Sequence, residues 1–230
     1  MTKHETYMSA AEALAATDEF YRNREGFGYD LEKVAGWLSQ HVRVPKKGRV
    51  LDLCCGDGIW SKGFQTVNPA LDLYGIDISS GGIAKARELV GDDGSHFVVG
   101  DVETSLPFEK GSFDLIFARG PGLFNQHDMS RPACVRVIEM WHEYLSERGL
   151  FYNIFASTPR LMGTYTPMEN AALPFNRAPR STETIDFSGG KYHHTVETFH
   201  APFWKAEEIE IVSYAFHGNN HVLVTRRKRG

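Results

Sequence analysis

Apolar residues in the first 45 positions recur at the spacing of an α-helix. Behind Asp30, a suitable N-cap, the recurring apolar residues are Leu31, Val34, Leu38 and Val42. This spacing predicts an amphipathic helix that Pro45 and Gly48 end. An Ala-rich stretch from about Tyr7 to Arg22 contains no Gly or Pro and predicts an earlier helix.

Beyond residue 48 the pattern changes to short, continuous apolar runs, which are typical of buried strands. Five such runs are Arg49–Cys54, Leu71–Ile76, His96–Val99, Phe113–Ala118 and Leu150–Phe155. Ser79 can cap a helix that runs to Val90. Ser130 and Pro132 open another that runs to about Ser146, with Leu145 on its inner face. Alternating strands and helices predict a parallel sheet with right-handed crossovers.

The C-terminal part lacks this alternation. From Ser157 to about Thr182, four prolines and mixed polar residues predict an irregular segment, which in a compact domain is either functional or mobile. Two hairpins are predicted after it, with a short helix over Trp204–Glu210 between them. Their strands are Thr182–Phe187 with Tyr192–Phe199, and Ile211–Phe216 with His221–Thr225.

Composition and charge narrow the setting. The formal net charge is −4, without the basic field that proteins on a nucleic-acid backbone usually carry, which argues against a nucleic-acid partner. The basic run Arg226–Arg229 is expected to be a solvated tail that blunts a strand edge. The three cysteines give no disulfide framework, and no window approaches the ~18 apolar residues of a membrane span. We therefore expect a soluble, cytoplasmic protein, a monomer or a homodimer.

One segment, Val50–Gly58, combines a buried strand, a glycine turn and the start of a helix. Glycines let the backbone approach a ligand closely, and the helix start offers free N–H groups. Ser61 stands where a dinucleotide fingerprint has its third glycine, which weakens a nicotinamide reading without excluding it. Asp77 and Asp101 end the second and third strands. All these strand ends meet at one edge of a parallel sheet, where such folds bind ligands.

This ordered set resembles the class I S-adenosylmethionine-dependent methyltransferase family, over roughly residues 49–155 and more loosely in the C-terminal hairpin. The resemblance implies an α/β fold: a Rossmann-like seven-stranded sheet, mostly parallel, with a C-terminal antiparallel hairpin and helices on both faces. The length is ordinary for a single α/β domain with an insertion, so we expect one domain over 1–230. Within that domain, residues 1–46 would be a helical cap, 47–156 the cofactor-binding core, 157–200 a substrate-side insertion, and 201–230 a C-terminal helix and hairpin.

The resemblance also implies S-adenosyl-L-methionine as the cofactor. By analogy, Asp52, Gly56 and Gly58 hold its methionine part and Asp77 its ribose. Asp101 meets the adenine amino group with the Val102 N–H nearby, and Ile78 packs on the adenine ring. Two positions depart from the family: Cys54 replaces its first glycine and Ile59 its last, which implies a reshaped methionine pocket.

The acceptor side is less defined by sequence. Methyl transfer depends mainly on alignment, and a base is needed only if the acceptor must lose a proton. Candidate bases are His127, His193, His194, Glu169 and Tyr165. Adjacent histidines in a strand point to opposite faces, so His193 and His194, even with His200 nearby, do not predict a metal site.

Arg119, at the end of the fourth strand, joins the cofactor-side residues as a candidate. It either contacts an acidic acceptor or pairs with a local carboxylate. The loop that follows lacks the paired prolines of amino-directed nucleic-acid methyltransferases. We therefore predict a methyltransferase with a small-molecule acceptor. Three alternatives stay open: an RNA- or protein-directed enzyme, a non-catalytic S-adenosylmethionine-binding subunit, and a nicotinamide enzyme.

Overall fold

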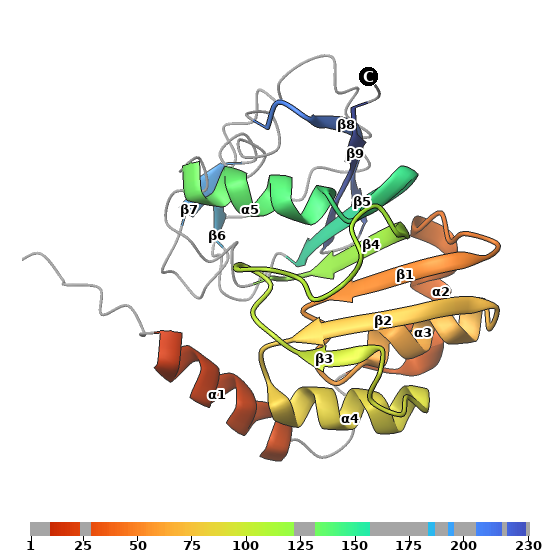
Figure 1. Cartoon of the computed structure of the whole chain (residues 1–230), viewed down its shortest axis with the longest axis vertical. Helices are drawn as coiled ribbons and strands as arrows, with labels where there is room; N and C mark the ends of the chain where they lie inside the picture. Colours follow the sequence, from red (N-terminus) through yellow and green to blue (C-terminus); the bar gives the residue numbers. More distant parts are fainter. Residues whose placement is uncertain are drawn as a thin grey trace, which may run out of the picture.

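A seven-stranded sheet forms the centre of the structure (Figure 1). The computed structural model describes residues 10–23, 29–121, 132–156, 184–186, 193–195, 206–217 and 220–228. The strands of the sheet are β1 (Gly48–Leu53), β2 (Leu71–Asp77), β3 (Phe97–Val99), β4 (Phe113–Arg119), β5 (Leu145–Ala156), β8 (Ile209–His217) and β9 (Asn220–Arg227).

The strand order is β3-β2-β1-β4-β5-β9-β8. Strands β1 to β5 pair in parallel, and β9 runs antiparallel to both β5 and β8. The predicted Rossmann-like sheet, mostly parallel with a C-terminal antiparallel hairpin, is therefore confirmed. The order reverses between β1 and β4, the kind of position at which open α/β sheets bind ligands.

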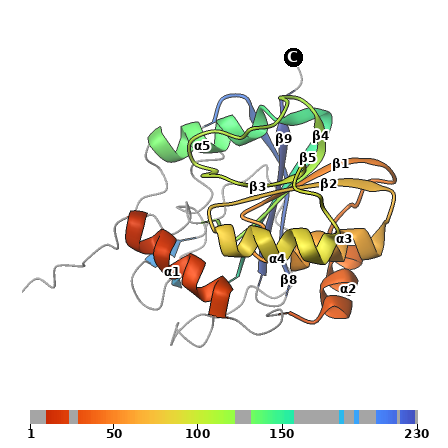
Figure 2. The ribbon, with the colours of Figure 1, turned by 60° about the horizontal axis from the view of Figure 1, so that its bottom comes forward.

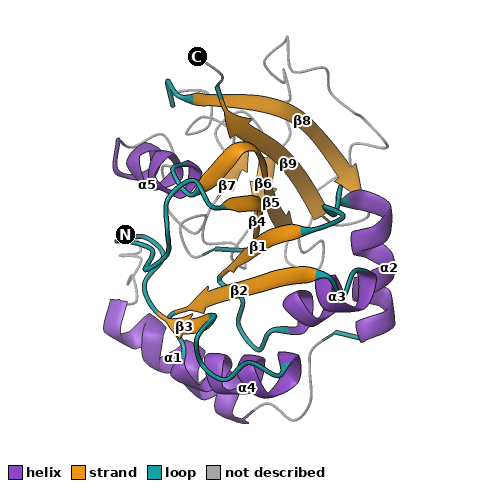
Figure 3. Cartoon of the chain, turned by 45° about the vertical axis from the view of Figure 1, so that its right-hand side comes forward, coloured by secondary structure: helices purple, strands orange, loops and turns teal. Residues whose placement is uncertain are grey.

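Helices cover both faces of the sheet, as predicted (Figures 2 and 3). Helices α2 (Leu31–His41), α3 (Ile59–Val67) and α4 (Ser80–Val90) lie on one face, where Leu38, Phe64 and Ile83 pack against the strands. Helix α5 (Pro132–His142) lies on the other face, where its Ile138 and Trp141 are fully buried. The two faces bury separate apolar clusters, which fix the sheet between them.

The helix boundaries follow from caps that the sequence contains. The Asp30 carboxylate accepts the Lys33 N–H at 3.1 Å at the start of α2. The Ser79 hydroxyl accepts the Gly82 N–H at 3.0 Å at the start of α4, and Gly91 ends that helix with φ of 79°. Both predicted N-caps are confirmed, because each oxygen satisfies an N–H that has no partner within its helix.

Helix α5 ends at His142 rather than near Ser146. Leu145, predicted to lie on the inner face of that helix, is the first residue of β5 and pairs with Phe113. The Tyr144 carbonyl accepts the Phe113 N–H at 3.0 Å. Pairing with β4 therefore overrides the helical pattern at these positions.

The short helix predicted over Trp204–Glu210 is wrong in its last part, while residues 201–205 lie outside the described residues. Residues 206–208 precede β8 without forming a helix, and Ile209 and Glu210 begin that strand. The Glu210 carboxylate accepts two hydrogen bonds from the Arg226 guanidinium, at 2.8 and 3.1 Å. Arg226 and Arg227 belong to β9 rather than to a solvated tail, because the strand pairing extends through them.

A separate pair of strands lies between β5 and β8 in the sequence. Strands β6 (Thr184–Asp186) and β7 (His193–Thr195) pair antiparallel, with Asp186 opposite His193. This pairing confirms the first predicted hairpin in its central part. Among the described helices, none is long and apolar enough to cross a bilayer.

Candidate functional site

The carboxyl ends of β1, β2 and β4 meet at one edge of the sheet. Asp52 of β1 lies opposite Gly75 of β2 and Phe117 of β4. Residues 54–58 turn from β1 into α3, and the Cys55 N–H donates to the Ile76 carbonyl at 3.1 Å. The turn is therefore attached to the end of β2, which brings the acids of both strands together.

Asp77, the last residue of β2, fixes this turn. One oxygen of its carboxylate accepts the Gly56 N–H and the other accepts the Ser79 N–H, each at 2.9 Å. Burial raises the pKa of the Asp77 carboxyl above its usual value, against the lowering effect of these hydrogen bonds. A carboxylate can accept up to about four hydrogen bonds, so Asp77 keeps some capacity for a further donor.

Asp52 is buried and accepts a 2.6 Å hydrogen bond from the Ser61 hydroxyl. Burial raises the pKa of its carboxyl to about 7; the Ser61 hydrogen bond opposes the rise, while the charges of Asp77 and Asp57 add to it. Ser61 therefore has a structural task at the position where a dinucleotide fingerprint has a glycine. That task was not apparent from the sequence.

The raised pKa of Asp52 gives a prediction about stability. In the unfolded chain this carboxyl ionises near its ordinary pKa of 3.8, whereas in the folded chain it ionises near 7. Between these values the folded state holds a proton that the unfolded state lacks, so this group lowers stability as the pH rises. Asp52→Asn, which keeps an oxygen for Ser61, is expected to be stabilised relative to the wild type by an amount that grows across this window.

Urea unfolding of both proteins at about pH 4.5 and about pH 7.5 measures the effect. Burial lowers the pKa of His142 to about 4, so this residue makes the protein less stable as the pH falls. In the wild type this effect opposes the pH dependence that Asp52 causes. It is present in both proteins and cancels in the difference between them. An Asp52→Asn difference that does not change with pH contradicts the raised pKa.

The turn itself has the backbone of a glycine-rich loop. Cys54, Gly56 and Gly58 have φ angles of 58°, 54° and 77°. Cys54 thus adopts the left-handed conformation that glycine favours, although it carries a side chain. Ile59, the other departure from the family pattern, begins α3 and is buried in the apolar cluster beneath it.

Apolar and acidic side chains lie exposed at the ends of β2 and β3. Ile78 is 39% exposed and Val99 is 52% exposed. Asp101 is also exposed, and one of its carboxylate oxygens accepts the Glu103 N–H at 2.9 Å. Val102 is buried, and its carbonyl accepts the Trp141 indole N–H at 2.7 Å. This edge therefore offers an apolar platform beside a carboxylate.

Helix α1 (Ala10–Asn23) packs beside α4 (Figure 2), and its Tyr21 lies against the glycine turn. Its Asp18 accepts the Ser79 hydroxyl at 2.8 Å and the Gly81 N–H at 2.9 Å, and these hydrogen bonds lower the pKa of Asp18 to about 2. A Cβ added to Gly56 would lie 2.2 Å from the Tyr21 hydroxyl oxygen. Sequence reasoning assigned neither Asp18 nor Tyr21 to the site, because α1 is far from the turn in the chain.

Arg119 ends β4, one residue beyond Ala118, which pairs with Leu53. Its guanidinium carbon lies 4.7 Å from the centre of the Tyr29 ring and 5.0 Å from that of Trp60. In the part of the chain that the structure describes, Arg119 forms no ion pair with a carboxylate. The alternative of a local carboxylate partner therefore finds no support there.

The candidate bases are placed less fully. His127, Glu169 and Tyr165 lie outside the described residues, as does His200. His193 and His194 lie in β7, and the structure describes only their backbone pairing. Among the described residues, no group of three histidine, cysteine or acidic side chains is arranged to hold a metal ion.

Asn153 of β5 is a residue that sequence reasoning missed. It lies opposite Ala118, close to the carboxyl end of β4, and is fully buried. Among the described residues, neither the oxygen nor the nitrogen of its amide has a hydrogen-bond partner. A buried amide without partners is costly, so such a side chain is a candidate for contact with a ligand.

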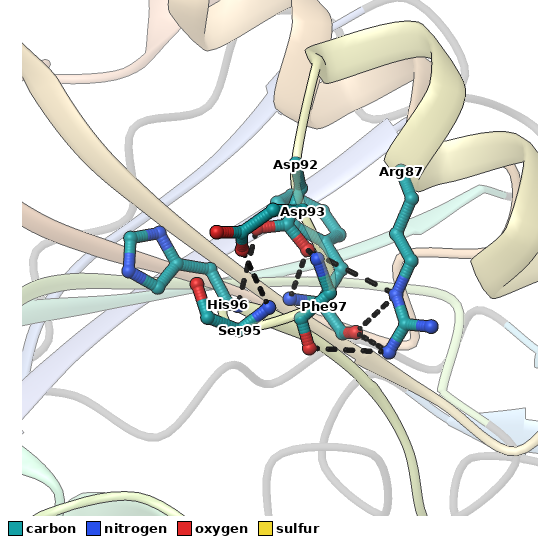
Figure 4. A network of polar contacts seen from close by, with 7 residues as sticks. Arg87, Asp92, Asp93, Ser95, His96 and Phe97 are labelled. Atoms are coloured by element: carbon teal, nitrogen blue, oxygen red, sulfur yellow. Dashed lines mark hydrogen bonds and ion pairs between the residues drawn. The ribbon is translucent and has the colours of Figure 1, made fainter.

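A hollow of about 350 Å³ lies at the opposite edge of the sheet, lined by the start of β2 and by the segment between α4 and β3. Figure 4 shows that the polar groups there bond to one another. Asp92 accepts the N–H groups of Gly94 and Phe97, and Arg87 donates to the Phe97 carbonyl. The network joins α4 to β3, and the hollow contains none of the predicted site residues.

Comparison with known proteins agrees with this geometry. A family model described as a methyltransferase domain matches residues 50–149. The chain is 33% identical over 79 residues to a malonyl-[acyl-carrier protein] O-methyltransferase from Legionella pneumophila, 34% of this chain and 28% of the relative. It is 36% identical over 83 residues to a demethylmenaquinone methyltransferase from Lactococcus lactis, 34% of this chain and 32% of the relative.

A further relative acts on RNA by its name. A ribosomal RNA small subunit methyltransferase C from Escherichia coli is 31% identical over 101 residues, 43% of this chain and 27% of the relative. The matched segments thus span less than a third of these three relatives.

A crystal structure of an S-adenosylmethionine-dependent methyltransferase from Mesorhizobium loti aligns with a TM-score of 0.58 and 20% identity, over 86% of this chain and all of that one. That likeness is one of fold. Together with the matched methyltransferase domain over residues 50–149, it supports the class I S-adenosylmethionine-dependent methyltransferase family.

Proposed function

We propose that this protein is an S-adenosylmethionine-dependent methyltransferase that acts on a small-molecule acceptor. The observation that carries the proposal is the position of Asp77, whose buried carboxylate ends β2 and accepts the Gly56 N–H of the glycine turn. A carboxylate fixed in this way beside a glycine turn is suited to the two hydroxyls of a ribose.

The residues of this edge fit the cofactor in their chemistry. Asp77 would bind the ribose, Ile78 would pack on the adenine, and Asp101 with the Val102 N–H would meet its polar edge. The positive φ angles of Cys54, Gly56 and Gly58 shape the turn that would hold the methionine part, next to Asp52. When bound, the cofactor supplies an electrophilic methyl group on a positively charged sulfur.

The chain's own contribution is to bind, orient and exclude water. Helix α1, held by Asp18, would cover the turn from one side with Tyr21. Asp52, with its pKa near 7, would favour a cationic amino group, because such a group stabilises the ionised carboxylate. His127, His193, Glu169 and Tyr165 stay candidates for a base, needed only for an acceptor that must lose a proton.

The choice of acceptor rests on charge and on the relatives. A net charge of −4 without a basic field argues against RNA, and the relatives include enzymes named for demethylmenaquinone and malonyl-acyl-carrier protein. An RNA acceptor is the second candidate, favoured by the Escherichia coli ribosomal RNA enzyme. Because none of the three cysteines forms a disulfide in the described structure, we also propose a reducing, cytoplasmic setting.

Methyl transfer by the isolated chain tests the proposal. Labelled S-adenosylmethionine is incubated with the protein and a cell extract separated into metabolites, RNA and proteins. We expect label in the metabolite fraction, and the Asp77→Ala variant is the negative control. Label confined to RNA or protein contradicts the small-molecule acceptor. Tight cofactor binding without transfer in any fraction favours a non-catalytic subunit.

A further inference from the structure

Arg119 is a cation that the described structure does not neutralise. It lies at the ligand edge of the sheet, and its guanidinium contacts the faces of Tyr29 and Trp60. Contact with aromatic faces attracts a guanidinium but satisfies none of its N–H donors. The two rings therefore hold the group in place while its donors are left for another partner.

Two donors in this cluster are buried and lack partners among the described residues. They are Nε of Arg119 and Nε1 of Trp60. Trp60 is the second residue of α3, and its ring stacks on Phe117 of β4 with centroids 5.4 Å apart and an interplanar angle of 28°. An indole nitrogen only donates, as does a guanidinium, so the missing partner must be an acceptor.

The surroundings favour one kind of hydrogen-bond acceptor. Tyr29, whose ring lies beside the Arg119 guanidinium, is 43% exposed. Three buried acids, Asp52, Asp57 and Asp77, lie on the neighbouring strand ends and turn. They would repel a doubly charged phosphate more strongly than a singly charged group. A planar group with one negative charge and two oxygens matches the fork of a guanidinium.

From this geometry we infer that Arg119 and Trp60, backed by Tyr29, form a binding site for the carboxylate of a ligand. Two ligands of the proposed reaction could bring that group: the amino-acid end of the cofactor, or an acceptor that carries a carboxylate. The inference rests on the proposed function for the identity of the ligand. The need of the two donors for a hydrogen-bond acceptor rests on the described residues alone.

Calorimetry with two cofactor-like compounds and two variants tests the first source. S-Adenosylhomocysteine has the carboxylate, whereas 5′-methylthioadenosine keeps the adenosine and the sulfur without the amino-acid end. If the cofactor brings the carboxylate, Arg119→Gln weakens S-adenosylhomocysteine about 10- to 100-fold and leaves 5′-methylthioadenosine unchanged. Arg119→Lys, which keeps the charge but not the fork, is expected to fall between wild type and Arg119→Gln.

Simple carboxylates test the second source. Benzoate and succinate are titrated into protein saturated with S-adenosylhomocysteine, with tryptophan fluorescence as the readout. If the methyl acceptor brings the carboxylate, the wild type binds one of these probes and Arg119→Gln does not. The wild type and the variant then bind S-adenosylhomocysteine with equal affinity. Arg148 is exposed and lies in β5, where the pairing with β4 is interrupted. Arg148→Gln is therefore the matched control and should behave as wild type.

The outcomes separate this inference from the proposed function. It is overturned if Arg119→Gln matches wild type toward S-adenosylhomocysteine, benzoate and succinate while keeping the wild-type circular dichroism spectrum. If wild type binds neither adenosyl compound, the proposed function fails, and the benzoate and succinate titrations of the free protein still decide the carboxylate site. Should Arg119→Gln fail to fold, Arg119→Lys carries the same comparison.

Discussion

Gly58→Ala is expected to destabilise the protein by about 2–4 kcal/mol, through strain and collision together. Gly58 precedes α3 with φ of 77°, a conformation that costs an alanine roughly 1–2 kcal/mol. In addition, the new Cβ would lie 2.8 Å from both the Cα and the Cβ of Ala86 in α4. Backbone atoms cannot give way as the end of a side chain can, so α3 and α4 must separate. Urea unfolding measures the loss.

Gly91→Ala is the matched control. Gly91 has nearly the same φ, 79°, but no atom lies within 4 Å of a Cβ added there. Backbone strain alone should therefore lower the free energy of unfolding of Gly91→Ala, by roughly 1–2 kcal/mol. Equal losses in the two variants would show that the close approach of the turn to α4 has no energetic consequence.

Asp77→Ala is expected to weaken S-adenosylhomocysteine binding by roughly 1.5–3 kcal/mol, or about 10- to 150-fold, through the loss of charge-assisted hydrogen bonds to the ribose. Because 5′-methylthioadenosine keeps the ribose, its affinity should fall by the same factor. If Arg119 contacts only a carboxylate, Arg119→Gln should leave the affinity for 5′-methylthioadenosine unchanged. The variant also removes the acceptor for the Gly56 and Ser79 N–H groups, so its free energy of unfolding should fall.

Two controls accompany this variant in calorimetry. Asp77→Asn keeps one oxygen for the turn but lacks the charge, and its loss of affinity should be smaller. Asp93→Ala changes an exposed acid at the opposite edge of the sheet and should bind as wild type. Wild-type affinity in Asp77→Ala would show that the ribose lies elsewhere.

The parts of the site that the sequence predicts are local. Val50–Gly58 specifies a strand, a turn and a helix start through neighbouring residues, and Asp77 is placed by the end of its own strand. Ser79 and Asp30 cap their helices three residues or fewer from the groups that they bind. Interactions of this range depend on spacing alone, which is why they can be predicted from one sequence.

The parts that could not be predicted join distant segments. Asp18 meets Ser79 across 61 positions, and the Ser61 hydroxyl reaches back to Asp52 through the turn. Tyr29 precedes α2, Trp60 lies in α3 and Arg119 ends β4, so three separate parts of the chain supply them. The end of α5 and the start of β8 were mispredicted for the same reason, since strand partners elsewhere in the chain decided both boundaries.

A crystal structure of the protein with S-adenosylhomocysteine bound is the most direct measurement. We expect the ribose hydroxyls within hydrogen-bond distance of the Asp77 carboxylate, with the adenine against Ile78 and the amino-acid end toward Asp52. A complex in which the compound lies away from the ends of β1 and β2, or in which Asp77 touches no part of it, would contradict the account.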